Sequence, residues 1–259
     1  MREFHRIRVT MNFFRTAILC VLSIFILNSC SCGNSARQGL RIGIDANWYP
    51  IDFGRQESYI NGFTEDLLLE IARYSGIEFQ RIPANWDNLF DGMKEKKFDA
   101  VLSSLPPYDF NAAKYDFSSN FLDLGPVLIV PVDAQHSDLS KMGGELLGVI
   151  VGDPSVLILQ KYPEIIIRNY NSIPDLLNAI VNGDIEGALL NRIPAVSYVR
   201  DLYSGKLKIA SSPLTATGLH LIAIKGKHRH LIQLFDKSLD YFKKKKKLQS
   251  LLQKWELET

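Results

Sequence analysis

Short apolar runs alternate with amphipathic segments along most of the chain, a pattern typical of α/β proteins. The run "LRIGI", starting at Leu40, predicts a buried strand. The next periodic segment predicts a helix with Thr64 as its N-cap, an apolar face from Leu67 to Tyr74, and Gly76 as its end. Because short strands alternate with helices in this way, parallel pairing is favoured over an all-β fold.

The sequence also contains an internal echo at an offset of 87 residues. The segments "WDNLFDGMKEKKFDAVLSS" (86–104) and "IPDLLNAIVNGDIEGALLN" (173–191) each predict a short amphipathic helix, a tight break and a buried strand. In the second segment, Ser172 and Asp175 form a capping box and Gly183 suits the helix end. The echo fits either two similar lobes or only the helix-then-strand order common to α/β folds.

If there are two lobes, the ends of the two echoed strands become candidate pocket walls. Ligands of open α/β sheets bind outside the carboxyl ends of the strands. Ser103 and Ser104 lie at the first of these ends, and Asn191 and Arg192 lie at the second. We therefore expect them on opposing walls of one cleft, with Arg192 facing away from its neighbour because adjacent side chains of an extended chain alternate.

The first thirty residues have the pattern of an export signal. Arginines precede an apolar run from Thr16 to Leu27, which is too short to span a membrane comfortably. The run ends in "LNSC", which resembles the lipobox of bacterial lipoproteins and makes Cys30 the expected lipidation site. We predict a signal peptide over 1–29 and a flexible tether over 30–39, with Met11 as an alternative start and an uncleaved anchor as the alternative to cleavage. In either case the body is expected outside the cytoplasm, in the periplasm or cell envelope.

Charge and cysteine content exclude several classes of protein. Removal of residues 1–29 takes away four arginines and one glutamate, so the formal net charge changes from +2 to −1. This balance gives no basis for nucleic-acid binding. Cys32 is the only cysteine beyond Cys30, so we expect no internal disulfide and no cysteine metal site. His228 and His230 lack an obvious third ligand, so no metal and no cofactor are expected.

The run of five lysines at 243–247 lies between two apolar-periodic stretches near the end of the sequence. Five successive lysines point to all sides of a helix, so the run predicts a solvated C-terminal helix. Attraction of these lysines to anionic lipid is the alternative.

Seven segments, in order and with near-family spacing, resemble the family 3 extracellular solute-binding proteins, which are the polar amino-acid receptors of ABC importers. The resemblance covers essentially all of the chain after the signal. The matched segments are "DANWYPIDF" (45–53), "GFTEDLLLEIARYSG" (62–76), "WDNLFDGMKEKKFDAVLSSL" (86–105), "YDFSSNF" (115–121), "GVIVGD" (148–153), "GDIEGALLNRIPAVSYV" (183–199) and "LLQKWEL" (251–257).

The resemblance implies a two-lobed, type II periplasmic-binding-protein-like fold. Each lobe is then a mixed sheet flanked by helices, and a two-stranded hinge joins the lobes. The chain would enter the second lobe near Pro131 and return near Thr215, which assigns 40–130 and 217–259 to lobe 1 and 131–216 to lobe 2. The implied function is binding without catalysis: a lipid-anchored monomer holds a small polar solute between the lobes and presents it to an ABC permease.

Carried over residue by residue, the family pattern also implies where a solute would be held. Trp48, Tyr49 and Trp86 fall at its aromatic walls, although Trp86 is equally suited to a core. Asp45, at the end of the first strand, fits either a ligand contact or a turn. The candidate ligand-binding residues are Asp45, Tyr49, Trp86, Ser103, Ser104, Asn111, Asp153 and Asn191.

Three of these positions depart from the family. The Arg that binds a ligand carboxylate in the family is here Asn111, and the Asp that binds the ammonium is Asn191. In the turn "GDPS" (152–155), which would donate backbone N–H groups to a carboxylate, Pro154 removes a donor and Asp153 adds negative charge. We therefore do not expect a standard α-amino acid bound in the family manner. We expect instead a neutral or weakly polar solute that stacks on aromatic side chains.

Two other functions remain open at this point. One is a hydrolyase resembling the periplasmic cyclohexadienyl dehydratases, which need a carboxylate-reading cation that Asn111 does not supply and a glutamate of raised pKa in the cleft. The other is a surface lipoprotein that keeps the fold but does not transport.

Overall fold

The computed structural model of the 259-residue chain describes residues 39–48, 51, 53, 56–135 and 138–258. The predicted signal peptide, Cys30, the rest of the tether before Gly39, and Tyr49 lie outside the described residues. Within the described ranges, none of the helices combines the length and the apolar character needed to cross a bilayer.

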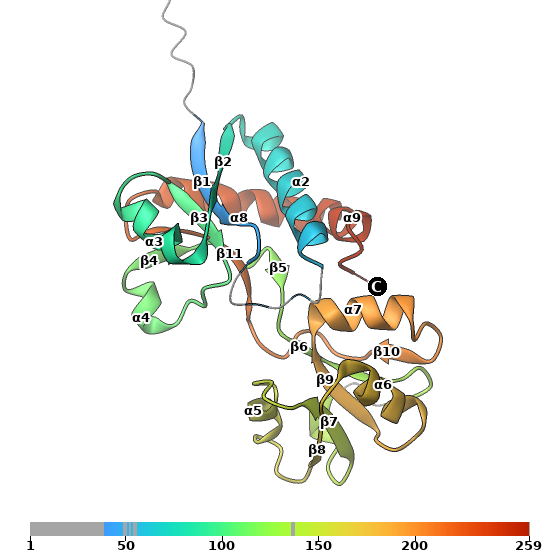
Figure 1. Cartoon of the computed structure of the whole chain (residues 1–259). Coiled ribbons are helices and arrows are strands. Elements are labelled where there is room, and N and C mark those ends of the chain that lie inside the picture. Colours follow the sequence, from blue (N-terminus) through green and yellow to red (C-terminus); the bar gives the residue numbers. More distant parts are fainter. Residues whose placement is uncertain (1–38, 49–50, 52, 54–55, 136–137, 259) are drawn as a thin grey trace, which may run out of the picture. The chain divides into compact units, whose positions relative to one another are not determined.

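The described strands form two mixed sheets (Figure 1). The first sheet has six strands in the order β2-β1-β3-β11-β4, with β5 paired to β11, and the second has five in the order β10-β6-β9-β7-β8. Each sheet contains both parallel and antiparallel pairs, so the predicted mixed α/β architecture is confirmed. The strands are β1 (Leu40–Asp45), β2 (Phe79–Ala84), β3 (Ala100–Ser103), β4 (Tyr115–Phe117), β5 (Leu122–Asp123), β6 (Pro126–Pro131), β7 (Leu146–Ile150), β8 (Ile166–Tyr170), β9 (Gly187–Asn191), β10 (Leu207–Ile209) and β11 (Gly218–Ile224).

The internal echo corresponds to equivalent places in the two sheets. Helix α3 (Trp86–Lys94) precedes β3, and helix α6 (Ile173–Val181) precedes β9. Strand β3 pairs parallel with β1 and antiparallel with β11, while β9 pairs parallel with β7 and antiparallel with β6. The predicted cap of α6 is confirmed, because the Ser172 hydroxyl accepts the Asp175 N–H at 3.2 Å.

Alternating side chains of the first sheet fill two cores. Leu102 and Leu221 face a core shared with helices α2 (Glu57–Ser75), α8 (Arg229–Lys244) and α9 (Lys247–Lys254), which lie together in Figure 1. Val101 and Ile222, one residue away on the same strands, face a second core with α3. The first sheet is thus covered by helices on both faces, which fits its near-continuous apolar strands.

The second sheet is built in the same way. Ile129 and Leu190 pack in a core with α6 and helix α7 (Arg192–Asp201). Leu128 and Leu189 face the opposite core, which includes helix α5 (Val156–Leu159) and the short 3₁₀ helix η1 (Leu139–Lys141). The remaining described helix, α4 (Asp109–Ala112), lies between β3 and β4 of the first sheet.

The predicted start of α2 at Thr64 is wrong, because the helix begins at Glu57. Thr64 is buried inside it and donates its hydroxyl to the Ile60 carbonyl at 2.7 Å. The apolar face extends back to Ile60 and Phe63, which are also buried, so packing outweighs the preference of threonine for a cap. The predicted end is confirmed, since Gly76 adopts the left-handed conformation at φ 71°.

The sequence had predicted that the lysine run lies in one solvated helix, but the run is divided between two helices. Helix α8 ends at Lys244 and α9 begins at Lys247. Lys246 between them has a left-handed φ of 56°. Lysines 243–246 are exposed, so the expected solvated character holds although the helix is broken.

Two crossing segments, residues 124–125 and 210–217, connect the sheets. The Leu124 N–H of the first segment donates to the Thr217 carbonyl of the second at 2.9 Å. The Leu214 N–H of the second segment donates at 2.8 Å to the carbonyl of Pro126, the first residue of β6. Strand β6 is paired in the second sheet from Pro126 onward, so the chain passes from one sheet to the other at 124–125. The lobe boundaries inferred from the resemblance stay a prediction.

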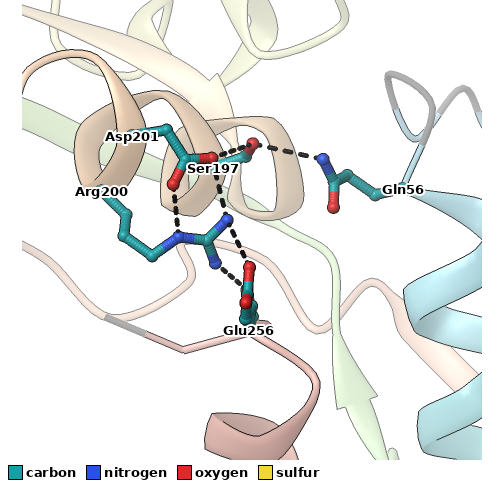
Figure 2. A network of polar contacts seen from close by, with 5 residues as sticks. All are labelled: Gln56, Ser197, Arg200, Asp201 and Glu256. Atoms are coloured by element: carbon teal, nitrogen blue, oxygen red, sulfur yellow. Dashed lines mark hydrogen bonds and ion pairs between the residues drawn. The ribbon is translucent and has the colours of Figure 1, made fainter.

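Helix α7 makes a further set of polar contacts, with segments that pack on the first sheet. Figure 2 shows the Arg200 guanidinium between Asp201 and Glu256; it donates to the Glu256 carbonyl at 2.6 Å and lies 3.1 Å from the Glu256 carboxylate. Gln56, at the start of α2, donates to the Ser197 hydroxyl at 3.2 Å. The neighbouring carboxylate of Asp201 raises the pKa of Arg200, so this cation stays charged at any physiological pH.

Candidate functional site

A pocket of about 610 Å³ lies at the carboxyl end of β9 and beside both crossing segments. Its walls come from the loop after β1, from the crossing segments, and from the turn after β7 together with α5 and the start of α7. Most of the lining is apolar or proline. The described lining residues are Ile51, Phe53, Tyr108, Leu124, Gly125, Pro126, Pro154, Ser155, Leu157, Ile158, Lys161, Asn191, Ile193, Pro194, Thr215 and Thr217.

The structure brings two of the predicted site residues together at this pocket. Asn191 ends β9 and lines the pocket, and its Nδ2 donates to Asp153 Oδ2 at 3.1 Å. Asp153 follows β7 and is half-buried. Because β7 and β9 are parallel neighbours, with Leu147 opposite Gly187, their carboxyl ends meet at one edge of the sheet. This placement agrees with the expectation for strand ends of α/β sheets.

The turn that contains Asp153 is closed on itself. The Asp153 N–H donates to the Ile150 carbonyl at 3.0 Å, Pro154 has no N–H, and the Ser155 N–H donates to Asp153 Oδ1 at 2.8 Å. Ser155 is 2% exposed and lines the pocket. Its hydroxyl is itself buried and has no hydrogen-bond partner among the described residues.

The predicted residues of the first sheet are placed differently. Ser103 and Ser104 are buried at the end of β3, and the Ser103 hydroxyl accepts the Leu105 N–H at 3.2 Å. Asp45 is buried at the end of β1 and accepts the Asn47 N–H at 3.0 Å, which is the contact of a turn. None of these three is among the described residues that line the pocket.

Asn111 and the tryptophans also have structural contacts. The Asn111 amide is buried and donates to the Pro106 carbonyl at 2.9 Å. Trp86 is half-buried at the start of α3 and contacts Phe90 edge-on, with ring centroids 5.6 Å apart. Trp48 is 2% exposed in the first core and donates its indole N–H to Asn61 at 2.9 Å. Ligand roles for Asn111 and Trp86 stay a prediction.

The sequence reasoning did not single out Tyr108, Leu157 or Lys161, which line the pocket. Tyr108 and Leu157 are largely exposed, although large apolar side chains are usually buried. At a concave site, their exposed surface can contact a solute. Tyr108 directly follows two prolines and could have been noticed for that reason. Nothing in the local sequence marks Lys161, whose place depends on how α5 packs.

His220 on β11 is a buried titratable group that the sequence did not mark. It is 5% exposed, and its Nδ1 lies 2.9 Å from the Ser118 carbonyl, so Nδ1 carries the proton and donates. Nε2 is buried without a partner among the described residues. Burial lowers the pKa of His220, because the charged imidazolium cannot be solvated there.

We expect His220 to make the folded state less stable in acid. Below the ordinary pKa of about 6.5, the unfolded chain binds a proton that the folded chain excludes. The free energy of unfolding therefore decreases as the pH is lowered from about 6.5 to the lowered pKa of the folded state. The slope from this group is at most about 1.4 kcal/mol per pH unit. Denaturant unfolding at pH 7.5 and 5.0 should show a smaller difference in His220→Asn, which keeps a donor for Ser118. The exposed His230→Asn is the control, and equal slopes in the wild type and His220→Asn would contradict the assignment.

The described residues contain no cluster of three or more side chains suited to hold a metal ion. His228 and His230 lie with ring centroids 6.3 Å apart. The described lining of the pocket also contains no glutamate that could serve as the acid of a dehydratase.

Comparison with known proteins places the chain among binding proteins. It is 21% identical to the L-cystine-binding protein TcyJ of Escherichia coli (strain K12), over 93% of this chain and 95% of that protein. It is 23% identical to the arginine-binding extracellular protein ArtP of Bacillus subtilis (strain 168), over 89% of this chain and 92% of that protein. Both names describe binding proteins, in agreement with the expectation that this chain is not an enzyme.

The fold is also similar to that of solved solute-binding proteins. The L-cystine solute receptor of Neisseria gonorrhoeae, solved in its unliganded open conformation, matches with a TM-score of 0.69 at 16% identity, over 85% of this chain and 93% of that one. The family model for bacterial extracellular solute-binding proteins, family 3, matches residues 40–258. This match covers both sheets and both crossing segments, and the chain belongs to the family 3 bacterial extracellular solute-binding proteins.

Proposed function

We propose that this chain is the lipid-anchored, extracytoplasmic solute-binding component of an ABC importer, and that it binds a small, polar, amino-acid-like solute in the pocket at the end of β9. The partner is an ABC permease, and the protein acts as a monomer. The relatives named for cystine and arginine support an amino-acid-like solute. Catalysis is not required.

One observation carries the proposal: a single pocket takes its lining from Phe53, from the second-sheet residue Asn191, and from both crossing segments. A solute bound there touches chain on either side of the crossings. Such a solute favours the arrangement in which both walls contact it, so binding shifts the population toward that arrangement. A permease that recognises this arrangement would then receive loaded protein.

The anchor rests on the N-terminal sequence alone. The apolar run ending in "LNSC" supports export and lipidation at Cys30, with 30–39 as the tether. A lipid at this position would hold the body at a membrane surface in the periplasm or cell envelope.

The replaced charges also belong to the proposal. The resemblance assigns Asn111 to the position of the family's carboxylate-binding Arg, and the Asn111 amide donates to the Pro106 carbonyl. Lys161, an exposed side chain, is the cation of the described lining. A lysine lacks the rigid two-donor fork of arginine, so it would hold a carboxylate less directionally.

A thermal-shift screen over amino acids, peptides, sugars and polyamines tests the proposal. We expect an amino-acid-like solute to stabilise the protein, by about 2.7 kcal/mol at a concentration 100 times its Kd. Leu157→Glu should reduce this stabilisation, because it places a charge in the apolar wall at a side chain that is 58% exposed and contributes little to the core. Leu202→Glu is the matched control at a side chain 67% exposed and outside the described pocket lining.

The outcomes separate the possibilities. Stabilisation that Leu157→Glu weakens and Leu202→Glu preserves supports solute binding at this pocket. Stabilisation that neither variant changes would place the solute elsewhere. If no solute of the panel stabilises the protein, the transport function is overturned in favour of a surface lipoprotein that does not transport.

A further inference from the structure

The second-sheet wall of the pocket has an unusual polarity. Asp153, Ser155 and Asn191 form one connected group, held by the two hydrogen bonds that the Asp153 carboxylate accepts. Asn191 and Ser155 are among the described lining residues, whereas Asp153, which is half-buried, is not. What the wall can bind therefore depends on how this carboxylate arranges its two neighbours.

The orientation of the Asn191 amide follows from its partner. An ionised carboxylate can only accept hydrogen bonds, so the NH₂ end of the amide must face Asp153, and it does so at 3.1 Å. The amide oxygen is then the free end, and it has no hydrogen-bond partner among the described residues. At the pocket, Asn191 presents an acceptor.

The backbone of the turn 152–155 offers no free N–H of Asp153, Pro154 or Ser155 beside this acceptor. The N–H groups of Asp153 and Ser155 are both used within the turn, and Pro154 has none. The buried Ser155 hydroxyl, which has no partner among the described residues, can accept as well as donate. The nearest charge in this group is the negative charge of Asp153, which repels an anion and attracts a cation.

We propose that Asp153 is a specificity-determining residue that makes the group formed by Asp153, Ser155 and Asn191 favour a cationic N–H donor of the solute, a protonated amine, over a carboxylate, while Lys161 remains the cation of the described lining. Asp153 acts through Asn191, which lines the pocket and accepts a hydrogen bond from the amine. The inference rests on the proposed solute-binding function and names the chemical group that the wall recognises.

The test uses the full chain and solutes that keep or lack the protonated amine and the carboxylate. Cystamine keeps both amines of cystine and lacks its carboxylates, whereas N,N′-diacetylcystine keeps the carboxylates and has no protonated amine. Calorimetry and thermal shift on the wild type should show cystamine binding at least as tightly as cystine, and diacetylcystine at least about tenfold more weakly, since a charge-assisted hydrogen bond contributes that much or more. Arginine and agmatine form a second pair in which the carboxylate alone is removed.

Asp153→Asn removes the charge and leaves an oxygen for the Ser155 N–H. We expect it to weaken cystamine and agmatine binding about tenfold or more. The difference in affinity between cystamine and diacetylcystine should become smaller. The exchange variant Asp153→Asn with Asn191→Asp restores one carboxylate and one amide in swapped places, and it should regain the preference for amines. Asp184→Asn, at an exposed carboxylate that is not among the described lining residues, should change neither.

A readout without solute keeps the inference testable in the apo protein. The side-chain ¹⁵N amide resonance of Asn191, assigned by its loss in Asn191→Asp, should shift in Asp153→Asn and remain in place in Asp184→Asn. An unshifted resonance would overturn the carboxylate–amide pair on which the inference depends.

Each outcome has one meaning. Diacetylcystine binding as tightly as cystamine, or an unchanged preference in Asp153→Asn, overturns the role of Asp153 and leaves the proposed function intact. If neither amino acid nor any of their derivatives binds the wild type, the proposed binding of amino-acid-like solutes is itself overturned, and the amine-selecting wall with it.

Discussion

Replacing Trp48 with alanine is expected to lower the free energy of unfolding by about 3–5 kcal/mol, the usual cost of removing a buried tryptophan. The indole is among the largest fully buried side chains described, and it fills the core between the first sheet and α2. Its N–H also donates to the Asn61 amide oxygen, which would lose this bond. Equilibrium denaturation followed by circular dichroism measures the effect.

Two variants separate packing from hydrogen bonding. Trp48→Phe keeps much of the apolar volume and should lose less stability than Trp48→Ala. Asn61→Ala removes the acceptor and leaves the indole N–H unpaired, with an expected cost of about 1–3 kcal/mol. A Trp48→Ala protein of nearly wild-type stability with greatly weakened solute binding would show instead that Trp48 is the aromatic pocket wall that the family resemblance implies.

Replacing Gly125 with alanine is expected to force the two crossing segments apart. A Cβ at this position would lie 2.7 Å from the Thr215 carbonyl oxygen and 2.6 Å from the Thr215 hydroxyl, both too close for a carbon atom. Overpacking of this kind usually costs about 1–3 kcal/mol. Because Gly125, Pro126 and Thr215 also line the pocket, we expect weaker solute binding as well as lower stability, measured by denaturation and calorimetry.

The double variant Gly125→Ala with Thr215→Ala tests the source of the strain. It removes the hydroxyl and leaves the backbone carbonyl in place, so it should recover only part of the lost stability. Full recovery of stability would mean that the Thr215 side chain alone clashed with the new Cβ, and that the Thr215 carbonyl did not. Wild-type stability and affinity in Gly125→Ala alone would contradict the close approach altogether.

The mixed sheets could be predicted because side-chain periodicity is local. The echoed helix-and-strand segments appear at equivalent positions of the two sheets, and the cap at Ser172 follows from neighbouring residues. The start of α2 could not be predicted from Thr64, because burial of Ile60 and Phe63 is decided by the packing of distant elements. The break at Lys246 is likewise a backbone feature that five identical residues cannot mark.

The site could be predicted only in part. Asn191, a candidate because it ends a strand, is among the described residues that line the pocket, and its role toward a solute stays a prediction. The sequence did not indicate that Asp153, 38 positions away, would bind the Asn191 amide, because that contact depends on the register of β7 against β9. The family resemblance assigns Asn111 to a ligand position. The contact of its amide with the Pro106 carbonyl depends on the local conformation of the loop, which the resemblance does not specify.

Helix α7 has a consequence for how the protein loses its structure. Its residue Ile193 packs in the core of the first sheet, while Ala195 and Val199 pack in the core of the second. Arg200 at its other end is held by Glu256 from the tail that follows α9. Unfolding of either core would remove packing contacts of this helix, so the two sheets should unfold as a single cooperative unit and not as separate modules.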